Sequence, residues 1–222
     1  SGIKTAVWFA DDPYYSDLSI ELAPHYEYVF THELAALSYY QEAGASQVYY
    51  LPLAVHEGLF RPMPVSRQYM SDVCFIGTGF PNRIALFNQL VPYLAHKKVV
   101  IVGALWHHLK QYRLLSNSII KGWMPAEETA KYYNGASIVI NCHRSPIDPV
   151  YNRNSREMPA YSINPRTYEI SACGTLQLTD IRQDLFSLYT PEEDLITYET
   201  ADELIEKIEN YLQDEEERRN IA

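Results

Sequence analysis

The clearest chemical signal lies in residues 162–180, SINPRTYEISACGTLQLTD, where two opposite charges stand one helical turn apart. Asn164 is an apt N-cap and Pro165 an apt first helical residue, so a helix is predicted to begin there. Arg166 then projects beside free backbone amides, which together suit a phosphate or a diphosphate. Glu169 follows on the same face, where a carboxylate can accept both hydroxyls of a ribose. The alternative is an i, i+3 salt bridge, but the apolar neighbours favour ligand binding.

A glycine-containing turn, IGTGFPNR, is the second candidate for a ligand site. Gly77, Thr78 and Gly79 precede a predicted helix, whose first turn carries Arg83. Glycines at such a turn let backbone amides approach a phosphate at the helix N-terminus. The dinucleotide fingerprint G-x-G-x-x-G is incomplete, since Asn82 stands where its last glycine would be. A tight strand-to-helix turn without a ligand is the alternative.

A third segment, IIKGWMP, ends another predicted strand. Gly122, Trp123 and Met124 could pack against a nucleobase and leave the base edge to backbone groups. The alternative is that Trp123 is an ordinary core residue.

A long segment without periodicity, residues 143–163, carries arginines in an otherwise acidic protein. Arg144, Arg153 and Arg156 outnumber Asp148 and Glu157. Irregular segments of this length in compact domains are usually functional or disordered. We expect a lid over an anionic ligand, with a flexible surface loop as the alternative.

Strand-like apolar runs alternate with helical periodicity along the chain. The predicted strands are 4–10, 26–32, 47–53, 72–78, 98–103, 118–123, 136–142, 175–180 and 194–198, with helices between them and at 202–219. Such a pattern is typical of parallel sheets covered on both faces. The predicted fold class is therefore α/β: a Rossmann-like doubly wound sheet over residues 63–222, preceded by a partial α/β domain and linker over residues 1–62.

Composition excludes several classes of function. The net charge of −10 argues against nucleic-acid binding, and no apolar run reaches the ~20 residues that a membrane helix needs. Cys74, Cys142 and Cys173 form no C-x-x-C pair, so we expect structural thiols in a reducing cytoplasm. Neither a D-x-D pair nor zinc-like His/Cys spacing occurs, and the chain is therefore expected to work without a metal.

Several quoted motifs resemble the glycosyltransferases of the GT-B fold, in the branch that contains the bacterial spore maturation proteins. The resemblance rests on DVCFIGTGFPNR, KGWMPAEETAKYYNGASIVIN, NPRTYEISACGTLQLTDIRQDL and YETADELIEKIENYLQDEEERRNIA, and covers nearly the whole chain. LPLAVHEGLFRP resembles the linker between the acceptor and donor domains of that fold. The first domain corresponds to only the final part of an acceptor domain, which leads us to expect a chain trimmed at both ends.

The resemblance implies a donor site for a nucleotide-activated sugar, with UDP or GDP as the nucleotide and no other cofactor. It places Glu169 at the ribose, Arg166 at the diphosphate and the base near 122–124. Asn164 and Thr167 are further predicted residues of the donor site. Many such enzymes carry a second glutamate eight positions before the first, where this chain has Tyr161, so inversion or retention stays open.

The expected function is metal-independent transfer of a sugar to a carbohydrate, glycoprotein or small-molecule acceptor. A catalytic base would come from the N-terminal part, where Asp11 and Asp12 end the first predicted strand and His32 ends the second. A nucleotide-sugar-binding module without catalysis and a nucleotide-sugar epimerase on the same fold are the alternatives.

Overall fold

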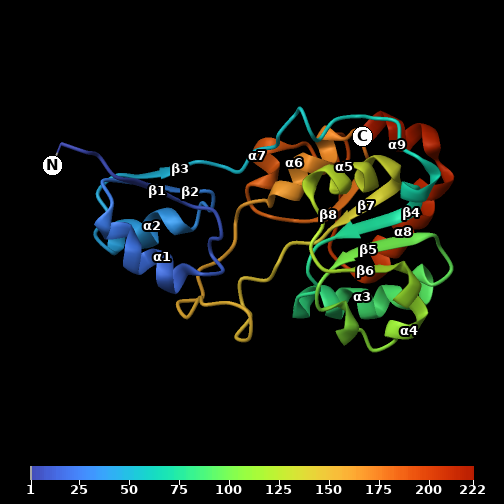
Figure 1. Ribbon diagram of the computed structural model, residues 1–222, viewed down its shortest axis with the longest axis horizontal. Coiled ribbons are helices and arrows are strands. Elements are labelled where there is room, and N and C mark those ends of the chain that lie inside the picture. The colour runs from blue at the N-terminus through green and yellow to red at the C-terminus, as the bar shows by residue number, and fades with distance from the viewer. Residues whose placement is uncertain (1) are drawn as a thin grey trace. The chain divides into compact units, whose positions relative to one another are not determined.

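The protein folds into two compact units in a computed structural model that describes residues 2–222 (Figure 1). The N-terminal unit comprises residues up to Ala54 together with two later segments, Ser145–Asn164 and Arg182–Leu185. The C-terminal unit contains Val55–Arg144, Pro165–Ile181 and Phe186–Ala222. The sequence predicted two contiguous domains divided at residue 62, whereas both units in the structure are discontinuous.

The C-terminal unit is built on a six-stranded, wholly parallel sheet. Its strands are β4 (Ser71–Ile76), β5 (Val99–Gly103), β6 (Ile119–Lys121), β7 (Ala136–Asn141), β8 (Gln177–Asp180) and β9 (Ile196–Tyr198). They are ordered β6-β5-β4-β7-β8-β9, and Val73 of β4 pairs with Val99 on one side and Ile138 on the other. The chain therefore reverses its direction of winding between β4 and β7, as a doubly wound sheet does. The predicted fold class is confirmed.

Helices cover both faces of this sheet, because its central strands are apolar on both sides. On one face, Phe75 of β4 packs edge-on against Phe87 and Trp106. On the other, Cys74 joins a cluster with Tyr133. Figure 1 shows α5 and α6 on one side of the strands and α3 and α4 on the other. The helices are α3 (Pro81–Leu94), α4 (Tyr112–Leu115), α5 (Ala126–Gly135), α6 (Pro165–Ala172), α7 (Leu185–Leu188), α8 (Ala201–Gln213) and α9 (Glu215–Ile221).

Two predicted helices are interrupted in the structure. The helix expected over 202–219 is divided between α8 and α9 at Asp214, whose side chain accepts a hydrogen bond from the backbone N–H of Glu217 at 2.9 Å. An aspartate in that role begins a new helix instead of continuing the old one. The helix predicted between the strands at 98–103 and 118–123 is a 3-10 turn over Trp106–His108 followed by the single turn of α4.

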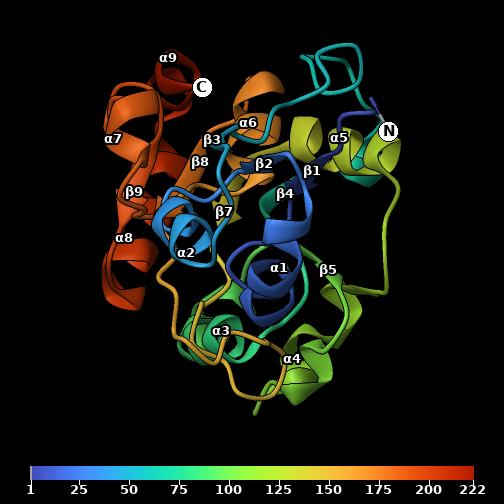
Figure 2. The same ribbon diagram turned by 90° about the vertical axis from the view of Figure 1, so that its left-hand side faces the viewer.

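The N-terminal unit has a three-stranded parallel sheet, ordered β1-β2-β3. Its elements are β1 (Ala6–Phe9), α1 (Ser16–Leu22), β2 (Tyr28–Thr31), α2 (Ala36–Glu42) and β3 (Val48–Tyr50). Both helices lie on the same side of the strands (Figures 1 and 2). Val29, Ala36 and Tyr40 are fully buried between the sheet and the helices.

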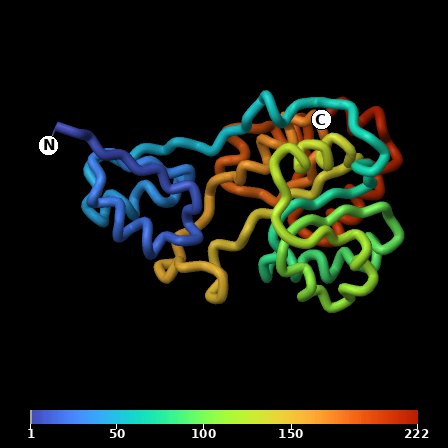
Figure 3. The backbone as a smooth tube through the Cα atoms, viewed as in Figure 1, coloured from blue at the N-terminus to red at the C-terminus, as the bar shows by residue number. Residues whose placement is uncertain are grey.

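Residues 145–164 are an integral part of the N-terminal unit. Figure 3 shows this gold segment beside the blue N-terminal residues. Met158 is fully buried in the core of that unit, and the N–H groups of Tyr161 and Ser162 donate to the carboxylate of Glu33 at 2.9 and 3.1 Å. These backbone groups and the Met158 side chain are therefore committed to tertiary contacts of the N-terminal unit, and the expected lid stays a prediction.

Candidate functional site

A cavity of about 300 Å³ lies at the carboxyl edge of the six-stranded sheet. Ligands of doubly wound sheets bind at this edge, where the strand order reverses. Six predicted donor-site residues line the cavity: Gly77, Thr78, Trp123, Met124, Arg166 and Glu169. The structure therefore brings together side chains from three separate segments of the sequence.

Arg166 and Glu169 line this cavity without pairing with each other. Helix α6 begins at Pro165, as predicted, which places Arg166 in its first turn. The Nε atom of Arg166 is buried and has no hydrogen-bond partner, and no ion pair joins Arg166 to Glu169 among residues 2–222. The alternative of a simple i, i+3 salt bridge is therefore wrong. Both groups keep their capacity to contact a ligand.

Burial raises the pKa of the Glu169 carboxyl, and the nearby charge of Arg166 only partly offsets this effect. The folded state therefore takes up a proton more readily than the unfolded state does. Stability contributed by this group falls as pH rises from 4.5 through the raised pKa. At neutral pH, the ionised carboxylate of Glu169 therefore lowers the free energy of unfolding.

A Glu169→Gln variant is accordingly expected to unfold at the same or a higher urea concentration than the wild type at pH 7. The difference should shrink as pH falls through the raised pKa, because the wild-type carboxyl is then neutral as well. Urea titrations at several pH values test this expectation, with the exposed Glu206→Gln as control. A variant that is less stable at every pH would show that Glu169 has a structural partner.

Arg83 holds two loops together beside the cavity but does not line it. Its side chain is buried, with Nε donating to the carbonyl of Cys142 and Nη1 to that of Thr78, both at 2.9 Å. The guanidinium also lies over the rings of Phe75 and Phe80. These contacts link the loop after β4 to the end of β7, so Arg83 shapes the turn predicted to bind phosphate.

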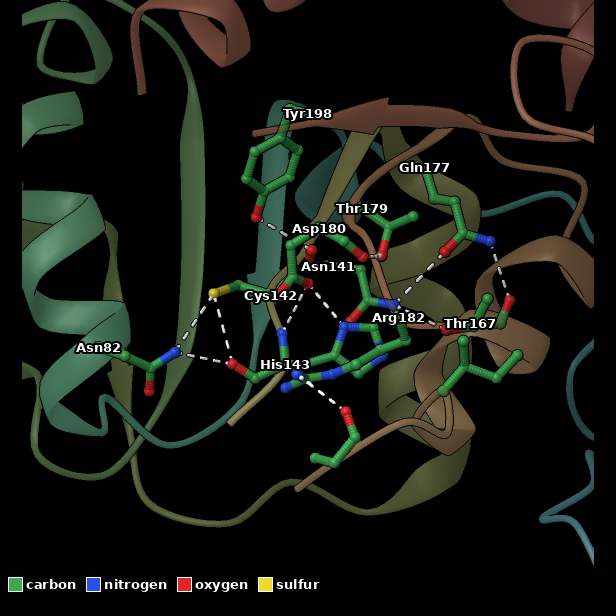
Figure 4. A network of polar contacts seen from close by, with 12 residues as sticks. Asn82, Asn141, Cys142, His143, Thr167, Gln177, Thr179, Asp180, Arg182 and Tyr198 are labelled. Carbon is green, nitrogen blue, oxygen red and sulfur yellow. Dashed lines mark hydrogen bonds and ion pairs between the residues drawn. The ribbon is translucent and has the colours of Figure 1, made fainter. Parts of the chain in front are cut away.

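Thr167 is buried and anchors α6 to the sheet (Figure 4). Its hydroxyl accepts a hydrogen bond from Asn141 Nδ2 at 3.0 Å, and its carbonyl accepts one from Gln177 Nε2 at 2.9 Å. Both partners belong to strands, β7 and β8. Thr167, predicted as a donor-site residue, thus fixes the helix turn that carries Arg166.

The remaining predicted residues lie next to the cavity lining. Gly79 packs closely against the indole of Trp106, and Asn164 directly precedes α6. Gly122 adopts a φ of 95° immediately before Trp123, a backbone conformation that favours glycine. Trp123 is 87% exposed, which excludes the alternative that it is an ordinary core residue.

Several residues of the cavity were not predicted from the sequence, among them Phe60, Gly103, Thr129 and Tyr133. Gly103 carried a signal, because it ends the strand run KVVIVG just as Gly77 follows the neighbouring run. Tyr133 carried no such signal, since a single tyrosine among the nineteen in the chain is most simply explained as a packing residue.

The three candidate bases lie in the N-terminal unit and differ in their surroundings. Asp11 is exposed, whereas Asp12 is 2% exposed and accepts hydrogen bonds from three hydroxyl groups. His32 is also buried, and neither ring nitrogen has a hydrogen-bond partner. Burial lowers the pKa of His32, and the charge of Asp12 partly opposes that shift.

Two further cavities lie outside the carboxyl edge of the sheet. One of about 460 Å³ borders residues at the amino ends of β4 and β7, including Ser71 and Ala136, and another of about 480 Å³ borders α8 and α9. Both are larger than the cavity at Arg166. We nevertheless select the cavity at Arg166 as the candidate site, because ligands of doubly wound sheets bind at the carboxyl ends of the strands.

Membrane-spanning helices and metal-binding clusters are absent from residues 2–222. Within that range, no helix is long and apolar enough to cross a membrane, and no group of three His, Cys, Asp or Glu side chains is placed to hold a metal ion. The three cysteines are free and buried, as expected for structural thiols, and burial raises the pKa of Cys142 to about 11.

The fold is the GT-B fold, as its likeness to solved structures shows. It aligns with a sucrose-phosphate synthase from Thermosynechococcus elongatus at a TM-score of 0.62 and 18% identity, covering 92% of this chain and 54% of that one. The HepE protein of Anabaena, solved with UDP and glucose, aligns at 0.68 and 14% identity, covering 97% of this chain and 64% of that one.

Comparison of the amino-acid sequence with known families and proteins identifies the family of this chain. The profile of the family described as glycosyl transferase-like matches residues 83–222, and the chain belongs to this family. It is 34% identical over 225 residues to the spore protein CgeB of Bacillus subtilis strain 168, covering 99% of this chain and 68% of that protein. The predicted resemblance to GT-B enzymes and to the spore protein branch is confirmed.

Proposed function

We propose that the C-terminal cavity binds a nucleoside diphosphate sugar, whose sugar is then transferred to an acceptor. In this proposal Arg166 contacts the diphosphate, Glu169 contacts the ribose, and Trp123 with Met124 packs against the base. UDP is the first candidate nucleotide, because the similar HepE structures hold UDP and UDP-glucose, and GDP is the second. The nucleotide sugar is a substrate, and the proposal includes no additional cofactor.

The observation that carries this proposal is the unpaired state of Arg166 and Glu169 in one cavity. A diphosphate oxygen can accept the hydrogen bond that Arg166 Nε does not make within the protein. Ribose hydroxyls can donate to the half-buried carboxylate of Glu169. A nucleotide therefore offers the two complementary groups that this cavity lacks.

Negative charge develops on the diphosphate when the bond to the sugar breaks. Arg166, the N-terminus of α6 and the backbone N–H group of Thr78 are the groups proposed to stabilise it, without a metal. The N–H groups of Gly77 and Gly79 donate instead to the carbonyls of Val102 and Ala104, both at 2.8 Å. The acceptor is proposed to be a carbohydrate, a glycoprotein or a small molecule. Asp11, Asp12 and His32 are the candidate bases of this proposal. We also propose a cytoplasmic location for the protein, which its three buried free cysteines suit.

Calorimetric titration of the 222-residue chain with UDP, GDP, dTDP and UDP-glucose tests the proposal. One nucleotide is expected to bind, and Glu169→Ala is expected to weaken that binding by about 1–3 kcal/mol, the free energy of an unmatched buried polar contact. Glu206→Ala, at an exposed helical glutamate outside the cavity lining, is the matched control and should bind like the wild type.

Absence of binding by a folded chain would contradict the proposal, as would equal affinities for the wild type and Glu169→Ala. Incubation of the bound donor then separates the kinds of activity. Transfer to an added acceptor identifies a transferase, whereas conversion of the sugar without any acceptor identifies an epimerase. Binding without turnover leaves a nucleotide-sugar-binding module.

A further inference from the structure

Tyr133 lines the proposed donor cavity and carries a buried hydroxyl group without a hydrogen-bond partner. The residue belongs to α5, lines the cavity and is fully buried. Its hydroxyl group makes no hydrogen bond within the described part of the chain. Its backbone carbonyl accepts a hydrogen bond from Thr175 Oγ1 at 2.9 Å, and its ring lies 6.3 Å from that of Phe60. These contacts fix the ring and leave the hydroxyl unused.

Stability does not explain why this position carries a tyrosine. A buried hydroxyl group without a partner costs folding free energy, since it loses its hydrogen bonds to water. Phenylalanine would fill the same volume between Phe60 and the sheet without that cost. Residues that lower stability in this way are typical of functional sites. Arg166 Nε is a second buried and unpartnered polar atom in the lining of the same cavity.

The chemistry of the neighbouring groups indicates what the hydroxyl could bind. Burial raises the pKa of Tyr133 well above its usual value, the charge of Glu169 adds to this effect and that of Arg166 opposes it, so the phenol stays protonated at neutral pH. A phenol both donates and accepts one hydrogen bond, whereas an ionised carboxylate only accepts. Two adjacent ligand hydroxyls, each a donor and an acceptor, match this combination.

We propose that the Tyr133 hydroxyl and the Glu169 carboxylate together bind the vicinal hydroxyls of the ribose. Tyr133 is then a specificity-determining residue, which makes the site prefer ribonucleoside over 2′-deoxyribonucleoside diphosphates. This inference rests on the proposed function, because it assumes that a nucleotide occupies the cavity. It adds a residue from α5 to a ribose contact otherwise attributed to α6 alone.

The test compares UDP with 2′-deoxy-UDP, or GDP with 2′-deoxy-GDP if the wild type binds guanine nucleotides, by calorimetry on the full chain. The wild type is expected to prefer the ribonucleotide by about tenfold, close to 1.4 kcal/mol. Tyr133→Phe is expected to lose most of this preference by weakening the ribonucleotide alone. Its urea midpoint should equal or exceed that of the wild type.

Tyr132→Phe is the matched control, because the adjacent tyrosine is half-buried, stacks edge-on against Tyr69 and does not line the cavity. It should leave both affinities unchanged. The double variant Tyr133→Phe/Glu169→Gln should weaken ribonucleotide binding by less than the sum of the two single changes, since both act on one diol.

Three results would overturn the inference. An unchanged ribose preference in Tyr133→Phe shows that the hydroxyl does not contact the sugar. Equal weakening of both nucleotides together with a lower urea midpoint assigns the hydroxyl a structural role. A wild type that binds neither UDP nor GDP removes the proposed function as well, so that failure is distinguishable from the first two.

Discussion

Gly103→Ala is expected to destabilise the C-terminal unit by about 3 kcal/mol or more and to distort the donor cavity. Gly103 ends β5 with a φ of 140°, and a Cβ atom there would lie 2.2 Å from the carbonyl oxygen of Gly77. That oxygen belongs to backbone and accepts a hydrogen bond from Trp106 Nε1 at 2.9 Å, so it cannot move aside alone. Relief requires the carboxyl ends of β4 and β5 to separate. Urea-induced unfolding measures the loss.

Gly122→Ala is the matched control for this prediction. Gly122 also has a positive φ, 95°, but an added Cβ atom would meet no atom within 4 Å. It should therefore show only the conformational cost of alanine at positive φ, about 1 kcal/mol. The difference between the two variants isolates the close approach of the two strand ends. Equal losses of unfolding free energy in the two variants would mean that the backbone at Gly103 relaxes at little energetic cost. The close approach of the two strand ends would then not define the cavity.

The strands were predictable because their apolar runs leave few alternatives. Runs such as KVVIVG and ASIVINC are short, rich in β-branched residues and separated by helical periodicity, which is the pattern of buried parallel strands. The switch point between β4 and β7 follows from the standard winding of such a sheet. The break at Asp214 was missed because the acidic run after it resembles a solvated helix end, although an aspartate three residues before Glu217 is also a capping signal.

The candidate site was partly predictable because its charged residues stand out in an apolar context. Arg166 and Glu169 interrupt small and apolar neighbours, and Gly77 follows a strand directly. Tyr133 could not be recognised, because an unsatisfied hydroxyl is a property of tertiary packing. The same limit applies to residues 145–164, where lack of periodicity predicts an irregular segment but not the core into which Met158 packs.

Asp12→Ala is expected to destabilise the N-terminal unit by about 3 kcal/mol. The Asp12 carboxylate, 2% exposed, accepts hydrogen bonds from Ser19 Oγ at 3.0 Å, Thr31 Oγ1 at 2.7 Å and the hydroxyl group of Tyr40. Truncation leaves the hydroxyl groups of Thr31 and Tyr40 without an acceptor in a small core, while Ser19 keeps only long hydrogen bonds of 3.4 and 3.5 Å to backbone carbonyls. Hydrogen exchange of the β1 and β2 amides, measured by mass spectrometry, reports on this unit separately from the larger one. Asp11→Ala, at the exposed neighbour, should change stability by less than about 0.5 kcal/mol.

The effect of Asp12→Ala should also depend on pH in a direction that the burial of Asp12 determines. Burial raises the pKa of its carboxyl above 3.8, although the three hydroxyl groups oppose the shift. The folded wild type therefore gains stability as pH falls through the raised pKa toward 3.8, and a variant without the carboxyl does not. The gap between them should widen on acidification. A gap that closes instead would show that the fold favours the ionised carboxylate of Asp12, because the three hydroxyl groups then outweigh the effect of burial.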